Sequence, residues 1–255
     1  MRQRGPAAPM RWVADWADVQ EPVLLPLFHT ILDRLAPPPG TRHLDIGCGT
    51  GLLLRIAAEC GLHVAGTDPA EALLDLARAR LPSARLEAGP AERLPFADRS
   101  FDLVTMLHAA DDDADSGPAL AEARRVAAPG GAILFAVRKL PAGIVSAIAP
   151  ASHRTTPATG GPQGARTSRL ETLRALAAEA KLVIAGAFDV DCRWHYPDEQ
   201  TALRGLGASR GAMRAAEAIG WNAVDAAHRE ALLPFRHDDG SYRIATVTRC
   251  LIARR

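Results

Sequence analysis

Glycine occupies every second position of the segment Gly47-Cys48-Gly49-Thr50-Gly51, directly after the first predicted strand, His43 to Ile46. A glycine turn after a strand lets the backbone approach a ligand where a Cβ atom would collide with it. A dinucleotide-binding loop has the spacing G-x-G-x-x-G, whereas the spacing here is G-x-G-x-G and Asp45 lies two residues before the first glycine. A carboxylate at that point opposes a diphosphate and suits a cationic ligand that carries an ammonium and a sulfonium group.

A second acidic residue, Asp68, follows the next predicted strand, Leu62 to Thr67. An acidic side chain at the end of that strand can accept both hydrogen bonds from a ribose diol. NAD-binding proteins share this feature, so Asp68 indicates a nucleoside ligand without selecting which one.

Five motifs follow one another in order between Thr41 and Val137. They are His43-Leu44-Asp45-Ile46-Gly47-Cys48-Gly49-Thr50-Gly51, Gly66-Thr67-Asp68-Pro69, Ala91-Glu92-Arg93-Leu94-Pro95-Phe96, Ser100-Phe101-Asp102-Leu103-Val104 and Arg124-Arg125-Val126-Ala127-Ala128-Pro129-Gly130-Gly131. Each motif alone is weakly specific. Together, in this order and spacing, they resemble the class I S-adenosylmethionine-dependent methyltransferases, in particular the small-molecule branch called methyltransferase type 11.

The resemblance implies that S-adenosyl-L-methionine is the cofactor and that the N-terminal segment, the glycine turn and the strand ends bind it. The residues that it implies are Trp16, Gln20, Asp45, Gly47, Cys48, Gly49, Gly51, Asp68, Pro69, Ala91, Glu92 and Leu107. In this family pattern Asp45 lies near the amino group of the cofactor and Asp68 holds the ribose hydroxyls. Ala91 and Glu92 border the adenine, and Leu107 lies beside the transferable methyl group.

The segment Asp15 to Glu21 resembles the N-terminal helix that closes over the cofactor in related enzymes. This resemblance is the reason for including Trp16 and Gln20. In the alternative interpretation, Trp16 packs between helices while Gln20 and Glu21 are solvated, as in ordinary amphipathic helices.

The third motif departs from the family pattern at Pro90. Relatives commonly have Gly-Asp-Ala-Glu where this chain has Gly89-Pro90-Ala91-Glu92, and that aspartate meets the adenine amino group. Proline can neither accept this hydrogen bond nor donate its own amide. We therefore expect cofactor affinity to fall by roughly 1 to 2 kcal/mol unless another group substitutes.

Methyl transfer is an in-line displacement at a carbon activated by the positive sulfur, so the protein mainly positions the reactants and excludes water. A general base helps if the acceptor is a hydroxyl or a protonated amine. His108, after the predicted strand Phe101 to Leu107, is the first candidate and His195 the second. Alternatively, His108 packs against adenine or caps a helix, and His195 lies at the surface or packs in a lid.

No metal is expected. The acidic run Asp111 to Asp115 is typical of a turn before a helix N-terminus, where the helix dipole favours carboxylates, more than of a magnesium site. The four cysteines lie far apart without a C-x-x-C pair, which favours reduced, unligated thiols.

Apolar strand-like runs alternate with helical runs, which favours an α/β fold with a parallel sheet covered on both faces. The predicted strands are His43 to Ile46, Leu62 to Thr67, Arg85 to Ala88, Phe101 to Leu107, Ala132 to Arg138, Leu182 to Phe188 and Tyr242 to Ala253. The resemblance implies a Rossmann-like sheet in the order 3-2-1-4-5-7-6, with strand seven antiparallel. Pro129-Gly130-Gly131 is expected to close the helix before strand five.

We expect one domain over residues 1–255, with an N-terminal cap helix at about 11–36 and a helical lid at about 197–237. Pro22 and Pro26 are expected to break or kink the cap helix. In the lid region, glycines separate two or three helical segments.

The net charge of +1 gives no overall attraction to nucleic acid or an anionic membrane, and no basic or aromatic recognition stripe appears. The N-terminus has no apolar signal region and no apolar run could span a bilayer. We therefore expect a cytoplasmic protein, monomeric or homodimeric, without nucleic-acid or membrane partners.

The combined prediction is transfer of a methyl group from S-adenosylmethionine to an oxygen or nitrogen of a small molecule, in bacterial secondary metabolism. One alternative is a biosynthetic enzyme, such as a cyclase, that keeps the cofactor as a structural ligand. Another is a nicotinamide-dependent oxidoreductase. The loop spacing disfavours the latter, as does the absence of a Tyr-x-x-x-Lys pair.

Overall fold

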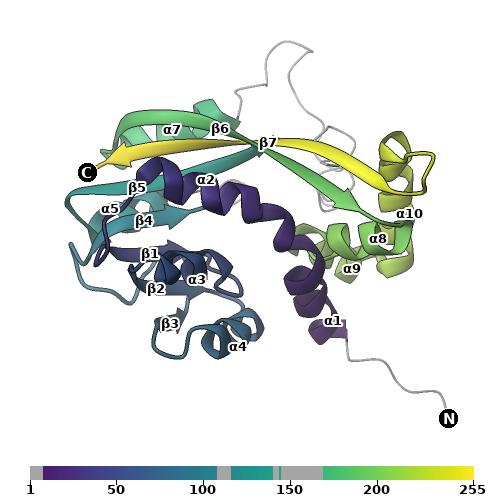
Figure 1. Ribbon diagram of the computed structural model, residues 1–255, viewed down its shortest axis with the longest axis horizontal. Coiled ribbons are helices and arrows are strands. Elements are labelled where there is room, and N and C mark those ends of the chain that lie inside the picture. The colour runs from purple at the N-terminus through teal and green to yellow at the C-terminus, as the bar shows by residue number, and fades with distance from the viewer. Residues whose placement is uncertain (1–7, 108–115, 140–143, 145–168) are drawn as a thin grey trace. The chain divides into compact units, whose positions relative to one another are not determined.

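The computed structural model describes residues 8–107, 116–139, 144 and 169–255 (Figure 1). The chain divides into two compact units. We name one the sheet unit, Pro26–Arg138, Arg166–Val190 and Thr248–Arg255. The other is the helical unit, Met1–Leu25, Lys139–Ala165 and Asp191–Val247.

The strands form one seven-stranded sheet in the order β3-β2-β1-β4-β5-β7-β6, as the resemblance implied. They are β1 (Arg42–Ile46), β2 (His63–Asp68), β3 (Arg85–Ala88), β4 (Phe101–Met106), β5 (Ala127–Lys139), β6 (Val183–Tyr196) and β7 (Tyr242–Arg254). The first five pair in parallel, and Figure 1 shows β7 running opposite to its neighbours. The predicted fold class is therefore confirmed.

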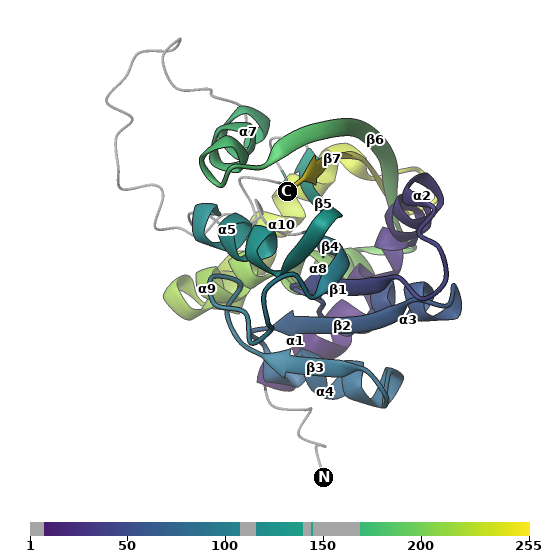
Figure 2. The same ribbon diagram turned by 90° about the vertical axis from the view of Figure 1, so that its left-hand side faces the viewer.

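The described helices of the sheet unit are α2 (Leu25–Leu35), α3 (Leu52–Glu59), α4 (Glu71–Arg80), α5 (Gly117–Val126) and α7 (Arg169–Glu179). In Figure 2, α5 and α7 lie on one side of the strands, and α2 and α3 lie on the other. Apolar side chains from β1, β4, β5 and α5 form a large core cluster that includes Leu44, Val104 and Phe135. Because both faces are covered, β1 is buried from His43 to Ile46 and β4 from Leu103 to Met106.

The helical unit begins with α1 (Ala8–Asp15), a π-helical turn (Trp16–Gln20) and a 3-10 turn (Pro22–Leu24). The helical path changes at Pro22, as predicted, because proline cannot donate to the preceding turn. Three further helices, α8 (Glu199–Gly207), α9 (Arg210–Ile219) and α10 (Trp221–Leu232), occupy the expected lid region.

Strand β6 is much longer than predicted and includes Trp194, His195 and Tyr196, which we had expected in the loop after it. Buried and exposed side chains alternate regularly from Val190 to Tyr196. This period of two is typical of a strand with one covered face. The expected loop position of these residues is therefore wrong.

Strand β5 also begins earlier than predicted, so Pro129-Gly130-Gly131 lies inside the strand and does not follow the helix as a separate turn. The register against β4 shifts between Phe101 and Leu103. Gly130 has φ 77°, and a Cβ on Gly131 would meet the Ala128 carbonyl oxygen at 2.9 Å. The glycines therefore form a bulge in the strand.

Candidate functional site

The glycine turn connects the carboxyl end of β1 to α3. Gly47, Gly49 and Gly51 have φ values of 78°, 56° and 75°, a left-handed conformation that other residues rarely adopt. The backbone N–H groups of Gly47 and Cys48 both donate to the Thr67 carbonyl of β2, at 2.7 and 2.9 Å. Nothing lies within 4 Å of where a Cβ on Gly47 would be, so open space faces the turn there.

Asp68 ends β2 and is 2% exposed. Its Oδ2 accepts a hydrogen bond from the Gly49 N–H at 3.0 Å, and its Oδ1 accepts one from the Ala70 N–H at 2.8 Å. Helix α4 begins at Glu71 with Ala70 as its N-cap residue, so Asp68 lies two residues before the cap. The carboxylate instead joins the glycine turn to the segment that enters α4.

Asp45 lies on β1 opposite Thr105 of β4, and Asp45 is 4% exposed. Its Oδ1 accepts a hydrogen bond from the Thr105 hydroxyl at 2.6 Å. The same hydroxyl oxygen lies 2.8 Å from Nε2 of His43, which is fully buried. Burial lowers the pKa of His43 to about 3, because the charged ring would lose its hydration. The imidazole is therefore neutral at physiological pH.

The residues expected beside adenine lie in the turn after β3. Ala91 is partly buried against the main core, whereas Pro69, Pro90 and Glu92 are exposed. The backbone N–H of Arg93 donates to the Pro90 carbonyl at 3.3 Å, so this carbonyl is used within the turn. An exposed carboxylate at Glu92 is accessible to a ligand.

Arg125 of α5 holds the continuation of that turn in place. Its guanidinium donates to the carbonyls of Leu94 and Phe96 at 3.0 and 2.8 Å and to the Glu122 carboxylate at 2.6 and 2.7 Å. Hydrogen bonds to Glu122 and then Asp98 raise the pKa of Arg125 above its usual range. Glu122 also accepts the Leu94 N–H at 2.8 Å, which links both ends of this short segment to α5.

Leu107 follows β4 directly and is buried. His108, the first candidate base, lies outside the described residues, as does the acidic run Asp111 to Asp115. The sheet unit brings together six of the predicted cofactor-binding residues. Asp45 and Asp68 lie at the carboxyl ends of β1 and β2, and Cys48 and the three glycines lie in the turn between β1 and α3.

Trp16 and Gln20 belong to the helical unit, where Gln20 and Glu21 are 4% and 3% exposed. Gln20 Oε1 accepts a hydrogen bond from the Tyr196 hydroxyl at 2.8 Å. The alternative interpretation, in which Gln20 and Glu21 are solvated, is therefore wrong. Binding of the cofactor by Trp16 and Gln20 stays a prediction. His195 is an exposed side chain on β6 between the buried Trp194 and Tyr196.

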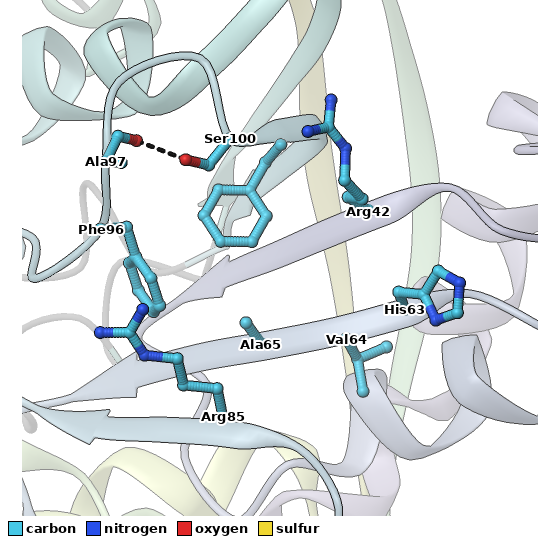
Figure 3. A pocket seen from close by; sticks show the side chains of 9 residues that line it. Arg42, His63, Val64, Ala65, Arg85, Phe96, Ala97 and Ser100 are labelled. Atoms are coloured by element: carbon cyan, nitrogen blue, oxygen red, sulfur yellow. Dashed lines mark hydrogen bonds between the residues drawn. The ribbon is translucent and has the colours of Figure 1, made fainter.

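A hollow of about 300 Å³ lies in the sheet unit at the amino ends of the strands, where Arg42, His63 and Arg85 begin β1, β2 and β3 (Figure 3). Both arginines are already paired, Arg42 with Asp102 at 2.7 Å and Arg85 with Glu87 at 2.8 Å. The glycine turn is at the opposite, carboxyl end of β1. Ligands of open α/β sheets bind outside the carboxyl ends, so we do not assign the cofactor to this hollow.

Among the residues that the structure describes, no group of three His, Cys, Asp or Glu side chains could hold a metal ion. A membrane span would need a longer and more apolar helix than any in the described part of the chain.

The sequence predictions missed Thr105 and His43, whose side chains touch the Asp45 network. The spacing of His43 and Asp45, two apart on a predicted strand, places both on one face. That periodicity could have indicated His43, whereas Thr105 becomes evident only from the pairing of β1 with β4.

In a comparison with known proteins, residues 44–135 match the model of a family described as a methyltransferase domain. A demethylmenaquinone methyltransferase of Renibacterium salmoninarum is 38% identical over 106 residues, 42% of this chain and 45% of that protein. A ubiquinone biosynthesis O-methyltransferase of Hahella chejuensis is 35% identical over 138 residues, 50% of this chain and 56% of that protein. The chain therefore spans about half the length of these curated relatives.

A solved methyltransferase of Geobacter sulfurreducens, in complex with S-adenosyl-L-homocysteine, superposes with a TM-score of 0.60 at 15% identity. The superposition covers 98% of this chain and 99% of that chain. At this level of identity the similarity concerns the fold alone.

Proposed function

We propose that this chain, whose residues 44–135 form a methyltransferase domain of the type 11 family, transfers a methyl group from S-adenosyl-L-methionine to a small-molecule acceptor. The observation that supports this most directly is the pair of buried carboxylates beside the glycine turn. Asp68 holds the Gly49 N–H from β2, and Asp45 lies just before the turn on β1. An acid on each side of a glycine-rich turn suits a nucleoside that carries positive charge.

The residues of the sheet unit fit this cofactor. The open space at Gly47 leaves room for the amino-acid part, and Asp45 would attract its ammonium group. Each carboxylate oxygen of Asp68 accepts one of the two protein hydrogen bonds described above, and an ionised carboxylate has about four acceptor positions. In this proposal the ribose hydroxyls donate hydrogen bonds to the Asp68 carboxylate.

Cys48, Gly49, Gly51 and Pro69 would contact the ribose and methionine parts in this proposal, and Ala91, Glu92 and Leu107 would border adenine and the methyl group. Trp16 and Gln20 would close over the cofactor. The whole chain would act as one domain, with residues 11–36 as the cap and 197–237 as the lid.

When bound, the cofactor supplies a methyl group on a positively charged sulfur, so no covalent nucleophile of the protein is needed. The protein residues hold the two reactants in line and exclude water, which can supply about 7 to 11 kcal/mol of the barrier reduction. If the acceptor is a hydroxyl or a protonated amine, His108 or His195 would take its proton.

The acceptor in this proposal is an oxygen or nitrogen atom of a small molecule. The demethylmenaquinone and ubiquinone methyltransferases matched above favour a small-molecule substrate. We place the reaction in bacterial secondary metabolism, because those relatives align with no more than half of this chain.

Titration calorimetry of the full chain with S-adenosyl-L-homocysteine tests the cofactor assignment, with NADH as the matched comparison. We expect binding of S-adenosyl-L-homocysteine and none of NADH. The absence of S-adenosyl-L-homocysteine binding, or binding of NADH in its place, would contradict the proposal.

Incubation with methyl-labelled S-adenosylmethionine and a panel of hydroxylated, aminated and carboxylated small molecules tests the reaction. We expect label in at least one hydroxylated or aminated product. A substrate converted while the cofactor remains unchanged would show instead an enzyme that keeps it as a structural ligand.

A further inference from the structure

We propose that His43 and Thr105 are positioning residues that orient the Asp45 carboxylate for the ammonium group of the cofactor. This inference rests on the proposed function, because the orientation of Asp45 matters for binding only if the cofactor carries an ammonium group. The three side chains form one continuous hydrogen-bonded chain inside the sheet unit, from His43 Nε2 through the Thr105 hydroxyl to Asp45 Oδ1.

The direction of each hydrogen bond follows from the number of protons. An ionised carboxylate can only accept hydrogen bonds. The Thr105 hydroxyl has a single proton, so it must donate it to Asp45 Oδ1, at 2.6 Å. The Leu44 carbonyl lies farther from the same hydroxyl, at 3.4 Å. The hydroxyl oxygen must then accept at 2.8 Å from His43, which requires the proton of the neutral ring to be on Nε2.

This arrangement leaves Nδ1 of His43 as an acceptor without a proton. Among the described residues, no group donates to this buried atom. A buried polar atom without a partner is unfavourable for folding. An apolar side chain of similar volume would therefore pack here at least as well, so folding stability alone does not account for histidine at this position.

The charge state of the ring matters for the ligand. His43 is 0% exposed, and its burial keeps the imidazole neutral. A neutral ring donates a hydrogen bond to Thr105 without placing a positive charge beside Asp45. The carboxylate thus keeps its negative charge for an incoming ammonium while its orientation is held by Thr105.

Four variants separate positioning from simple packing. His43→Leu and Thr105→Val remove a donor while approximately keeping volume. His43→Gln and Thr105→Ser are the matched controls, because a glutamine amide reaches about as far as imidazole Nε2 and serine keeps the hydroxyl. Affinity for S-adenosyl-L-homocysteine is compared with affinity for 5′-deoxy-5′-methylthioadenosine, which has the same nucleoside but no ammonium group.

We expect His43→Leu and Thr105→Val to raise the dissociation constant of S-adenosyl-L-homocysteine about three- to tenfold. The two controls should bind as the wild type does. Affinity for methylthioadenosine should not change in any variant, and the unfolding midpoint of His43→Leu should not fall. In the double variant His43→Leu/Thr105→Val, the loss should equal that of Thr105→Val alone.

Wild-type affinity in His43→Leu, or equal weakening of both ligands, would overturn the inference, because the effect would not pass through the ammonium. Nitrogen NMR of the ligand-free wild type shows which ring nitrogen of His43 carries the proton, and so tests the hydrogen-bonded chain without any cofactor. We expect a proton on Nε2 and none on Nδ1 of His43. A proton on Nδ1 would contradict the proposed hydrogen bond from His43 to Thr105. If the wild type binds neither ligand, the proposed function fails and the positioning role fails with it, whatever the NMR result.

Discussion

Asp68 Oδ2 accepts the backbone N–H of Gly49 at 3.0 Å, which ties the end of β2 to the middle of the glycine turn. The other oxygen accepts the Ala70 N–H at 2.8 Å, just before α4. One buried carboxylate therefore holds the turn in its shape before any ligand is present. A site that is organised in advance loses less conformational entropy on binding.

Replacement of Asp68 by asparagine tests this double role. The amide nitrogen cannot accept a hydrogen bond, so either Gly49 or Ala70 loses its partner and the ribose loses an acceptor. We expect the dissociation constant of S-adenosyl-L-homocysteine to rise at least about tenfold, since hydrogen bonds to charged groups contribute about 1.5 to 3 kcal/mol. Titration calorimetry measures this dissociation constant. Asp75→Asn, on the exposed side of α4 beside Arg78, is the control and should bind normally.

Gly66 of β2 has no space for a side chain. A Cβ there would lie 2.8 Å from both Cys48 Sγ and Leu54 Cδ1. We expect Gly66→Ala to displace the glycine turn and α3, lowering the free energy of unfolding by about 1 to 3 kcal/mol and weakening cofactor binding. Urea denaturation checks the stability. Gly89→Ala, where nothing lies within 4 Å, should retain wild-type stability, and equal losses in both variants would contradict the steric explanation.

Arg125 donates hydrogen bonds to two backbone carbonyls and to both carboxylate oxygens of Glu122. We expect Arg125→Ala to lower the free energy of unfolding by about 2 to 3 kcal/mol, because the carbonyls of Leu94 and Phe96 lose their donor. Thermal and urea denaturation measure the change. Arg78→Ala, which removes exposed ion pairs to Glu71 and Asp75, should leave the unfolding midpoint unchanged. A stable Arg125→Ala protein would show that water replaces the guanidinium.

The pH dependence of the free energy of unfolding should reflect the low pKa of buried His43. Its pKa is about 3 in the folded chain, whereas an unfolded histidine titrates near about 6.5. Between these values the unfolded chain binds a proton that the folded chain does not. The free energy of unfolding therefore falls as the pH drops below about 6.5, by up to about 1.4 kcal/mol per pH unit.

His43→Leu lacks this titration, so the variant should gain stability relative to the wild type as the pH falls from about 7 to about 4.5. Urea denaturation of both proteins across this range measures the difference. Parallel stability curves would mean that the ring is hydrated or paired in its charged form.

In the helical unit, Tyr196→Phe removes the hydrogen bond to Gln20. Because Gln20 is buried, we expect the free energy of unfolding to fall by about 1 to 3 kcal/mol. If Gln20 also closes over the cofactor as proposed, S-adenosyl-L-homocysteine should bind more weakly. Unchanged affinity in a destabilised variant would limit Gln20 to a structural role.

The sequence predicted the features that depend on neighbouring residues. Apolar strand-like runs between helical runs indicated all seven strands, the glycine spacing indicated the turn at Gly47, and Pro22 indicated the break in the first helical segment. Backbone sterics and strand periodicity act over a few residues, so they can be recognised without knowing which segments pair. The order of the sheet came from family resemblance, and the structure confirmed it.

Only the tertiary structure decided which distant side chains meet. Thr105 reaches Asp45 because β1 and β4 pair in one particular register, and the residues are 60 positions apart in the chain. The same pairing buries His43 and keeps it neutral. Strand β6 likewise extends to Tyr196, and one of its faces is buried from Val190 onward. Register, burial and hydrogen-bond partners are properties of the assembled sheet, and no local pattern of residues determines them.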